Sequence, residues 1–424
     1  MLMGLARVGV LLVAALLVAG GAQAQAPVTA LVHATLIDGS GQAPLRDATI
    51  IIENGRIVAI GPRLAAPSGA RAVDLTGKFV TPGIINGHGH VGPAPRDPQL
   101  AQYARYGVTT TTSMYFDPDD IVAFKARQQA GDLQGARILT VKYRFMSPPF
   151  IPGSEVKTPE DARRKVDEIV ANGADFVKVW IDAQGGRYPK LSREFCAAVL
   201  DQARKHNKIT MAHIVELEDA RMIVDEGVNI LVHDVRDQVI PDDFTAVLKS
   251  RNVAVIPTLA REEAMFVFGE GPGFTDNPFF QKGLTPERLA LLKSKKRDEQ
   301  ANDPDRPKYL RMFDNDKINT KKLFDAAVPM GFGTDSGGDP NRYFLHGWFE
   351  HRQMELMVAV GLTPMQVIEA FSRVNSQILG IDRDFGTLAP RKVADLLVLG
   401  RNPLDDITNM RSIETVYLGG KPFE

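Results

Sequence analysis

Residues 79–90 read Phe79-Val80-Thr81-Pro82-Gly83-Ile84-Ile85-Asn86-Gly87-His88-Gly89-His90, an apolar run that ends on glycines and two histidines. Such a run is typical of a buried β-strand. Side chains at positions i and i+2 of an extended chain project to the same side, so His88 and His90 can reach one cation. Gly87 and Gly89 let the backbone come close without steric cost. The spacing predicts part of a metal site at a strand end; a polar turn with two unrelated histidines is the alternative.

Further apolar runs of strand length follow this stretch and alternate with helical patterns. This alternation indicates repeated βα units and a parallel sheet. Eight such units fit an α/β fold of the (β/α)₈ barrel type, whose active site lies at the C-terminal ends of the strands. A doubly wound open sheet is the structural alternative. The eight runs are 79–86, 108–114, 138–143, 176–180, 209–212, 230–232, 253–257 and 328–333.

The two ends of the chain have a different pattern from this middle. Residues 28–74 alternate apolar and polar residues between turn signals, and Asn54-Gly55 between two apolar runs is a hairpin signal. Short strands with Gly or Pro turns return at 386–399 and 415–421. We therefore predict one small β-sandwich domain formed by both chain ends. The predicted division is a signal peptide at 1–24, the β-sandwich domain at 25–78 plus 384–424, and the barrel at 79–383.

Composition restricts the class of partner. The chain has 424 residues and 44% hydrophobic content, enough for a sizeable core. Fifty basic residues nearly cancel 51 acidic ones, which gives a formal net charge of -1. The chain therefore has no large net charge that would attract nucleic acid or an anionic membrane. We expect a small-molecule substrate as partner, and a homo-oligomer is left open.

The amino-terminal segment predicts export. Arg7 precedes an apolar run at 8–19, and Ala22-Gln23-Ala24 is a small-x-small cleavage site. These are the parts of a secretory signal peptide, so we expect a periplasmic or secreted protein with no membrane contact after cleavage. An uncleaved signal anchor is the alternative. The single cysteine, Cys196, excludes an intrachain disulfide and lies in a helical pattern typical of a buried small hydrophobe.

Residues able to bind metal follow several later strands. Lys178 lies inside the apolar run 176–180, where an ammonium is costly unless it is paired or neutralised. His213 ends the fifth run, His233 ends the sixth, and Asp335 follows the eighth. Each has an ordinary structural explanation on its own. Together with the paired histidines of the first run, they predict one metal site at the mouth of the barrel.

Three arginines also follow strand ends, namely Arg144, Arg236 and Arg261. Guanidinium groups bind carboxylates through two parallel hydrogen bonds, so we predict that at least one of them binds a substrate carboxylate. The alternative for each is an ion pair with a neighbouring acidic residue. The neighbouring acidic residues are Asp234, Asp237, Glu262 and Glu263.

The segment 262–322 is a long, charged gap between the seventh and eighth runs. Loops of this length are usually functional or disordered. We predict an insertion over the barrel mouth that is helical at 285–300, and a solvated surface excursion is the alternative. The remaining histidines lack the strand-end placement and are expected to be structural or on the surface. They are His33, His206, His346 and His351, of which His346 is the least secure exclusion.

The order of these groups resembles a known family. A His-x-His pair, a lysine in the fourth strand, two later histidines and a Gly-Thr-Asp-Ser end resemble the amidohydrolase superfamily. The branch is the one similar to imidazolonepropionases and secreted bacterial Xaa-Arg dipeptidases and prolidases. Residues 82–90 resemble its first motif, and 386–390 with 392–396 resemble its closing β-domain signature. These motifs are specific for the superfamily and its metal site but weakly informative about substrate.

The resemblance implies two divalent metal ions, with zinc as the expected metal. A hydroxide shared by the metals would attack the substrate carbonyl, and Asp335 would take the proton and deliver it to the leaving nitrogen. A neutral lysine amine can take up CO₂, and the resulting anion is stabilised between two cations. The implied ligands are His88, His90 and Asp335 for one ion, His213 and His233 for the second, and the N6-carboxylated Lys178 as a bridge.

Two departures from the family limit this transfer. The residues after His213 (214–216) and after His233 (234–236) differ from those of many relatives. The expected metal site does not depend on these residues, but the substrate of the relatives cannot be transferred to this chain. We predict hydrolysis of a C–N amide bond, in a dipeptide or N-acyl amino acid with a free carboxylate. The alternatives are a cyclic amide, lactone or ester hydrolase, and a non-catalytic metal-binding scaffold. Imidazolonepropionase activity itself is disfavoured, because Lys178 suggests two metals and the chain is expected to be exported.

Overall fold

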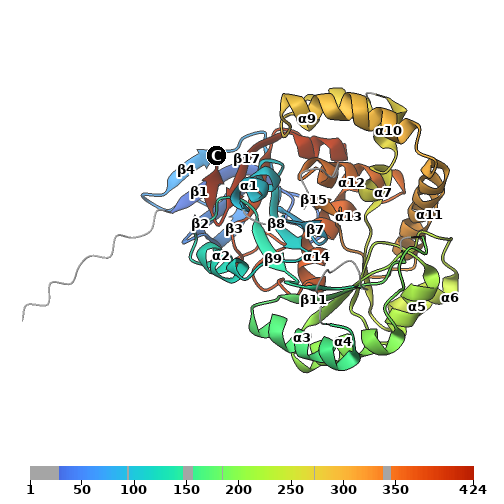
Figure 1. Cartoon of the computed structure of the whole chain (residues 1–424). Helices are drawn as coiled ribbons and strands as arrows, with labels where there is room; N and C mark the ends of the chain where they lie inside the picture. Colours follow the sequence, from blue (N-terminus) through green and yellow to red (C-terminus); the bar gives the residue numbers. More distant parts are fainter. Residues whose placement is uncertain (1–27, 93–94, 147–155, 184, 272, 338–344) are drawn as a thin grey trace, which may run out of the picture.

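The computed structural model describes residues 28–424 apart from 93–94, 147–155, 184, 272 and 338–344 (Figure 1). The predicted signal peptide therefore lies outside the described residues. Among the helices within these ranges, none combines the length and the apolar character that a membrane span requires.

Both ends of the described chain contribute strands to one eight-stranded sheet. Asn54 and Gly55 join two of its antiparallel strands with positive φ angles of 51° and 75°, as a tight hairpin turn requires. The predicted hairpin is confirmed, and both chain ends contribute to one sheet as predicted, whereas the sandwich form and the domain bounds stay predictions. The strands are β1 (Thr29–Leu36), β2 (Leu45–Glu53), β3 (Arg56–Pro62), β4 (Arg71–Asp74), β5 (Phe79–Pro82), β16 (Leu396–Leu399), β17 (Ile413–Leu418) and β18 (Lys421–Phe423).

The first predicted run, 79–86, is not one strand. β5 pairs with β1 and β16 in the terminal sheet, whereas β6 (Ile84–Asn86) pairs in parallel with β8 (Val108–Ser113). The chain passes from one sheet to the other at Gly83. A Cβ there would lie 2.2 Å from Thr109 Cγ2, so only glycine allows this close passage. The single-strand prediction is wrong because the chain changes partners at this glycine.

The middle of the chain forms parallel sheets, as predicted. β6, β8 and β9 (Arg137–Thr140) form a three-stranded sheet. A five-stranded parallel sheet follows in chain order. Side chains on both faces are buried, as expected for strands covered by helices. The five strands are β10 (Arg144–Phe145), β11 (Phe176–Trp180), β12 (Ile209–His213), β13 (Ile230–Val232) and β14 (Ala254–Ile256).

The eighth predicted run, 328–333, contains one bridge residue in place of a regular strand. Met330 bridges Val255 of β14. Asn375 occupies the position of a neighbouring strand, since its side chain accepts from Phe332 N at 2.9 Å and donates to Phe332 O at 2.7 Å. The prediction of a regular β-strand over this run is therefore wrong. Just beyond it, β15 (Ser336–Gly337) pairs in parallel with β7 (Gly89–His90).

Helices alternate with the parallel strands and cover them from outside (Figure 1). Cys196 is buried on α4, as predicted, and burial raises the pKa of its thiol to about 12. The helices outside the 262–322 segment are α1 (Asp97–Arg105), α2 (Asp120–Gln129), α3 (Pro159–Ala171), α4 (Arg193–Lys205), α5 (Leu217–Asp225), α6 (Asp242–Ser250), α7 (Leu259–Glu263), α12 (Trp348–Ala359), α13 (Pro364–Glu369), η4 (Ala370–Val374), α14 (Asn375–Ile378) and η5 (Ile407–Arg411).

The long segment between the seventh and eighth runs is mainly helical. Thr285 Oγ1 accepts from Arg288 N and so caps the predicted helix, which the structure confirms. Asn319, in the last helix of the segment, donates to Val235 O at 2.8 Å, so that helix is docked against the parallel sheet region. The elements are η1 (Val267–Glu270), η2 (Gly273–Asp276), α8 (Pro278–Gln281), α9 (Pro286–Leu291), η3 (Leu292–Lys296), α10 (Arg297–Ala301) and α11 (Arg306–Asp325).

Candidate metal centre

Three of the predicted ligands converge at the C-terminal ends of the first and last parallel segments. The ligand atoms of His88, His90 and Asp335 all lie within 4.8 Å of one another. His90 Nε2 is 2.6 Å from Asp335 Oδ1, and His88 Nε2 is 3.5 Å from the same oxygen. All three side chains are buried. Two imidazoles and a carboxylate at this spacing match the donor set of a divalent metal site.

The backbone fixes the position of Asp335 relative to the histidines. The amides of Thr334 and Asp335 both donate to His88 O, at 3.1 and 2.7 Å. Asp335 adopts a left-handed conformation with φ of 54°, which aspartate tolerates better than most residues. The pairing of β15 with β7 extends the same contact. The carboxylate is thus held beside the two histidines by main-chain hydrogen bonds.

The other three predicted ligands lie against this cluster. The ring of His233 is 4.5 Å from that of His88 and 4.5 Å from that of His213. Lys178 is 1% exposed, and its Nζ lies 2.9 Å from His88 Nε2. The structure therefore brings all six predicted ligand residues into one buried group at neighbouring strand ends.

Two of the imidazoles show how a second ion would be accommodated. His213 Nε2 is buried and has no hydrogen-bond partner among the residues that the structure describes, since Asp182 Oδ2 lies 3.8 Å away. His233 Nδ1 lies 2.5 Å from Thr258 Oγ1, which orients the ring and leaves Nε2 as the nitrogen available to another ligand. Sequence reasoning missed Thr258, although its place after the seventh strand was a possible signal.

The charge states of these groups also fit a cation. Burial lowers the pKa of His88 and His233 well below the ordinary value, and it lowers the pKa of His213 to about 3. These rings are therefore neutral, which is the form that binds metal. Burial raises the pKa of Asp335, but the charge and hydrogen bond of His90 outweigh this effect, so the pKa lies well below its ordinary value. The donor set therefore includes three neutral imidazoles, those of His88, His213 and His233, and an ionised carboxylate.

The predicted substrate arginines occupy different environments. Arg236 is 1% exposed and pairs with Glu262 at 2.9 Å, which matches the ion-pair alternative. Arg261 also pairs with Glu262, at 2.8 Å, but its side chain is 22% exposed and its Nε lies 3.5 Å from Asp335 Oδ2. Arg144 is partly exposed and lies over aromatic rings, 4.8 Å from that of Tyr115. Arg144 and Arg261 thus remain near the cluster, whereas Arg236 is buried in an ion pair.

The four other histidines lie in ordinary hydrogen bonds. His33 and His206 are at the surface beside aspartates. His346 donates to His90 O at 3.2 Å, and His351 donates to Tyr106 O at 2.8 Å. Burial lowers the pKa of His346 to about 4, so this ring is neutral. Its hydrogen bond is to the backbone of a candidate ligand.

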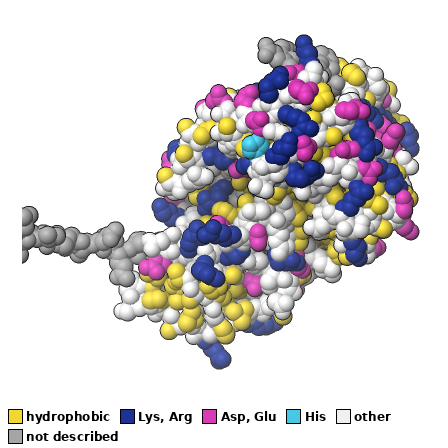
Figure 2. All heavy atoms as spheres, turned by 90° about the horizontal axis from the view of Figure 1, so that it is seen from below, with side chains coloured by type: hydrophobic (Ala, Val, Ile, Leu, Met, Phe, Trp, Pro, Cys, Tyr) yellow, Lys and Arg dark blue, Asp and Glu magenta, His cyan; other side chains and the backbone are white. Residues whose placement is uncertain are grey.

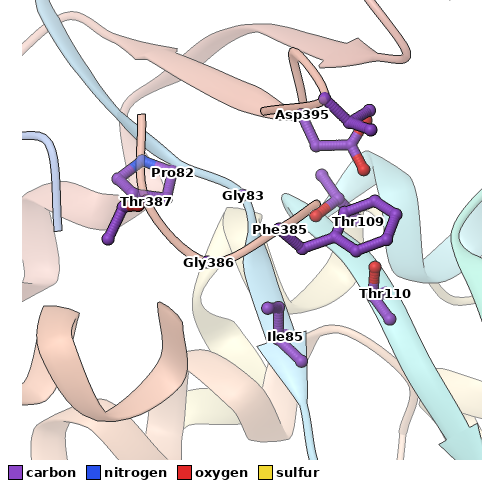
Figure 3. Close-up of a pocket in the computed structure, with 10 residues that line it drawn as sticks. Pro82, Gly83, Ile85, Thr109, Thr110, Phe385, Gly386, Thr387 and Asp395 are labelled. Atoms are coloured by element: carbon purple, nitrogen blue, oxygen red, sulfur yellow. The ribbon is translucent and has the colours of Figure 1, made fainter. Parts of the chain in front are cut away.

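A separate pocket lies where the terminal sheet meets the parallel strands (Figure 3). Its lining includes Gly83, Thr110, Phe385 and Asp395. None of the six candidate ligands lines this pocket. It is therefore distinct from the metal cluster.

Comparison with known proteins gives one family match and several distant relatives. The model of the amidohydrolase family matches residues 79–423. A solved protein from Bifidobacterium longum, with a provisional assignment as a prolidase, has a TM-score of 0.74 and 27% sequence identity. The match covers 94% of this chain and 95% of that one.

Two curated relatives are similar at lower identity. The 5-methylthioadenosine/S-adenosylhomocysteine deaminase of Symbiobacterium thermophilum is 23% identical over 428 residues, covering 86% of this chain and 83% of the relative. The imidazolonepropionase of Mycolicibacterium smegmatis is 24% identical over 179 residues, covering 34% of this chain. That match spans less than half of the relative, 45% of its length.

Proposed function

The chain belongs to the amidohydrolase family, as its motifs predicted, and from this premise we propose a metal-dependent hydrolase that cleaves a carbon–nitrogen amide bond. Its proposed substrates are dipeptides or N-acyl amino acids with a free carboxylate. The observation that carries the proposal is the buried group of His88, His90 and Asp335, whose ligand atoms lie within 4.8 Å of one another. Zinc sites in proteins are built from donors of this kind, imidazole nitrogens and carboxylate oxygens.

The proposed binuclear centre uses all six ligands. His88, His90 and Asp335 would hold one ion, and His213 and His233 the second. We propose a carbamate on Lys178 as the bridge, formed when its neutral amine adds CO₂ and loses a proton. The 2.9 Å contact between Lys178 Nζ and His88 Nε2 supports this assignment. Zinc is the proposed metal, because imidazole and carboxylate oxygens suit it.

When bound, the divalent ions would polarise the scissile carbonyl and lower the pKa of the attacking water. Asp335 would accept the water's proton on its carboxylate as the C–O bond forms, and would return it to the leaving nitrogen as the C–N bond breaks. Asp335 is ionised, because the charge and hydrogen bond of His90 outweigh the effect of burial and hold the pKa of its carboxyl well below the ordinary value. Water and amide thus yield a carboxylic acid and an amine.

For substrate selection, we propose that Arg144 or Arg261 binds the α-carboxylate. Both side chains are partly exposed, and Arg261 Nε lies 3.5 Å from Asp335 Oδ2. Arg236 is unsuited to this role, since its charge is already paired with Glu262 in a buried position. A carboxylate held there would orient the scissile carbonyl towards the metal ligands.

For the fold, we propose that the parallel strands close into an eight-stranded barrel. Hydrogen bonds between successive segments support closure. Gly331 N donates to Val255 O at 2.8 Å, and Gly87 N donates to Phe332 O at 2.9 Å, which links the last segment to the first. The likeness to the Bifidobacterium longum structure over 94% of this chain also supports it.

We also propose that the mature protein is periplasmic or secreted and acts on small molecules. The signal-like residues 1–24 support export. On the face shown in Figure 2, basic and acidic side chains are interspersed and do not form a patch of one sign. This arrangement supports a small substrate in preference to nucleic acid.

Release of a free amine from a panel of dipeptides and N-acyl amino acids tests the proposal, with the zinc-loaded mature protein as enzyme. Asp335→Asn is the matched control, because it keeps the size of the side chain and cannot accept the proton. We expect amine release with the wild-type protein and strongly reduced release with the control. Hydrolysis of cyclic amides, lactones or esters alone would refute the dipeptide assignment. Metal binding without any hydrolysis would support the scaffold alternative.

A further inference from the structure

Glu350 is a fully buried carboxylate outside the proposed ligand set. It lies in the first turn of α12 and is 0% exposed. Its Oε2 accepts from Gly347 N at 2.7 Å, which caps the helix. Its Oε1 accepts from Asn86 Nδ2 at 2.6 Å, Thr334 Oγ1 at 2.8 Å and Ser336 Oγ at 2.6 Å. One carboxylate therefore receives four hydrogen bonds.

The three donors to Oε1 adjoin candidate ligands on two different segments. Asn86 precedes His88 by two residues and accepts from His88 N at 3.0 Å. Thr334 and Ser336 immediately precede and follow Asp335. Asn86 Nδ2 also donates to Thr334 Oγ1 at 2.9 Å, which closes the network between the two segments. Glu350 thus connects the side chains on either side of Asp335 to the side chain of Asn86, which in turn accepts from the amide of His88.

Helix capping alone does not account for this arrangement. A cap requires only the contact between Oε2 and Gly347, whereas three of the four hydrogen bonds go to the ligand-bearing segments. Hydrogen bonds to a charged acceptor in a dry environment are strong and directional. Removing the acceptor would leave buried donors unsatisfied and remove the side-chain link between the two segments, which only their main-chain hydrogen bonds would then hold.

We infer that Glu350 is a positioning residue that sets the spacing between Asp335 and the histidine pair and so fixes the affinity and geometry of the metal site. The inference rests on the proposed function, because it requires that these residues bind a metal. Outer groups that orient ligands typically change metal affinity by about 10–100-fold when they are removed.

The test compares Glu350→Gln with Glu263→Gln in the full-length mature protein. Glu263 is also buried, and its carboxylate pairs with Arg352 of α12, so it controls for general loosening of that helix. The dissociation constant for Zn²⁺ is measured by competition with a chelator. The visible spectrum of the Co²⁺-loaded protein reports the coordination geometry, and circular dichroism establishes that each variant is folded.

We expect Glu350→Gln to bind Zn²⁺ about 10–100-fold more weakly and to change the Co²⁺ spectrum. Glu263→Gln should leave both unchanged. If Glu350→Gln does not fold, the Zn²⁺ affinity of Ser336→Ala becomes the deciding measurement. This variant removes one donor to Oε1 and keeps the helix cap. Unchanged Zn²⁺ affinity in the deciding variant, or an equal loss in Glu263→Gln, would overturn the inference. A wild-type protein that binds no metal would overturn the proposed function as well.

Discussion

Replacing Lys178 with methionine tests the bridging role of this residue with little change in side-chain length. Lys178 lies in β11 between two buried valines, and its Nζ contacts His88 Nε2 at 2.9 Å and Met114 Sδ at 3.3 Å. Methionine fits an apolar strand and brings no polar group that must be buried. We therefore expect the metal-free variant to have a free energy of unfolding at least equal to that of the wild-type protein.

The effect should appear only when metal is present. Binding to the native state adds RT ln(1 + [M]/Kd), which is about 2.7 kcal/mol at a free metal concentration of 100 times Kd. If loss of the bridge weakens binding about 100-fold, the same concentration equals Kd and adds only RT ln 2, about 0.4 kcal/mol. The variant should thus lose about 2.3 kcal/mol of metal-dependent stabilisation.

Denaturant unfolding with and without buffered Zn²⁺, in the presence of bicarbonate, measures this difference. Lys142→Met is the matched control. The Lys142 side chain is 6% exposed and pairs at 2.6 Å with Asp119, which is not a candidate ligand. Its loss should leave the metal-dependent gain unchanged. A full metal-dependent gain in Lys178→Met would show that the lysine is an ordinary buried strand residue.

Three further predictions concern the reaction and the chain end. Asp335→Asn should lower kcat by about 10²–10⁴-fold in steady-state assays, because an amide cannot accept the proton, and a near-wild-type kcat would contradict its role. The wild-type enzyme should cleave free acids about 10²-fold faster than their C-terminal amides, because the amide loses a contact between arginine and carboxylate worth about 2–3 kcal/mol. Arg144→Met or Arg261→Met should remove this preference. Equal rates of the wild-type enzyme on acid and amide would refute carboxylate binding. Sequencing of exported protein should find Gln25 first, whereas an unprocessed cytosolic chain would contradict export.

The ligand residues could be predicted because their signal is local. His90, Lys178 and His213 each lie in or directly after an apolar run of strand length, and the run itself shows that the side chain is buried. Parallel strands connected by helices bring their C-terminal ends together, so a residue's place along its strand predicts its neighbours. This reasoning placed six residues in one group without knowledge of any distance.

The supporting contacts could not be predicted, because they join segments far apart in the chain. Glu350 bonds to Asn86, 264 positions away, and Asn375 bonds to Ile85, 290 positions away. Neither residue differs in type or local pattern from an ordinary polar residue of a helix. The break at Gly83 likewise depends on the close approach of Thr109. Such features arise from tertiary packing, which a periodic pattern does not encode.

The central claim is that the six ligand residues hold two divalent ions. Elemental analysis of the purified, fully active mature protein tests it most directly, with the metal content and kcat measured on the same sample. The proposed binuclear centre predicts two metal ions per chain, since its donor set exceeds the needs of one tetrahedral ion. One metal ion per chain at full activity would contradict the binuclear centre and the bridging role of Lys178.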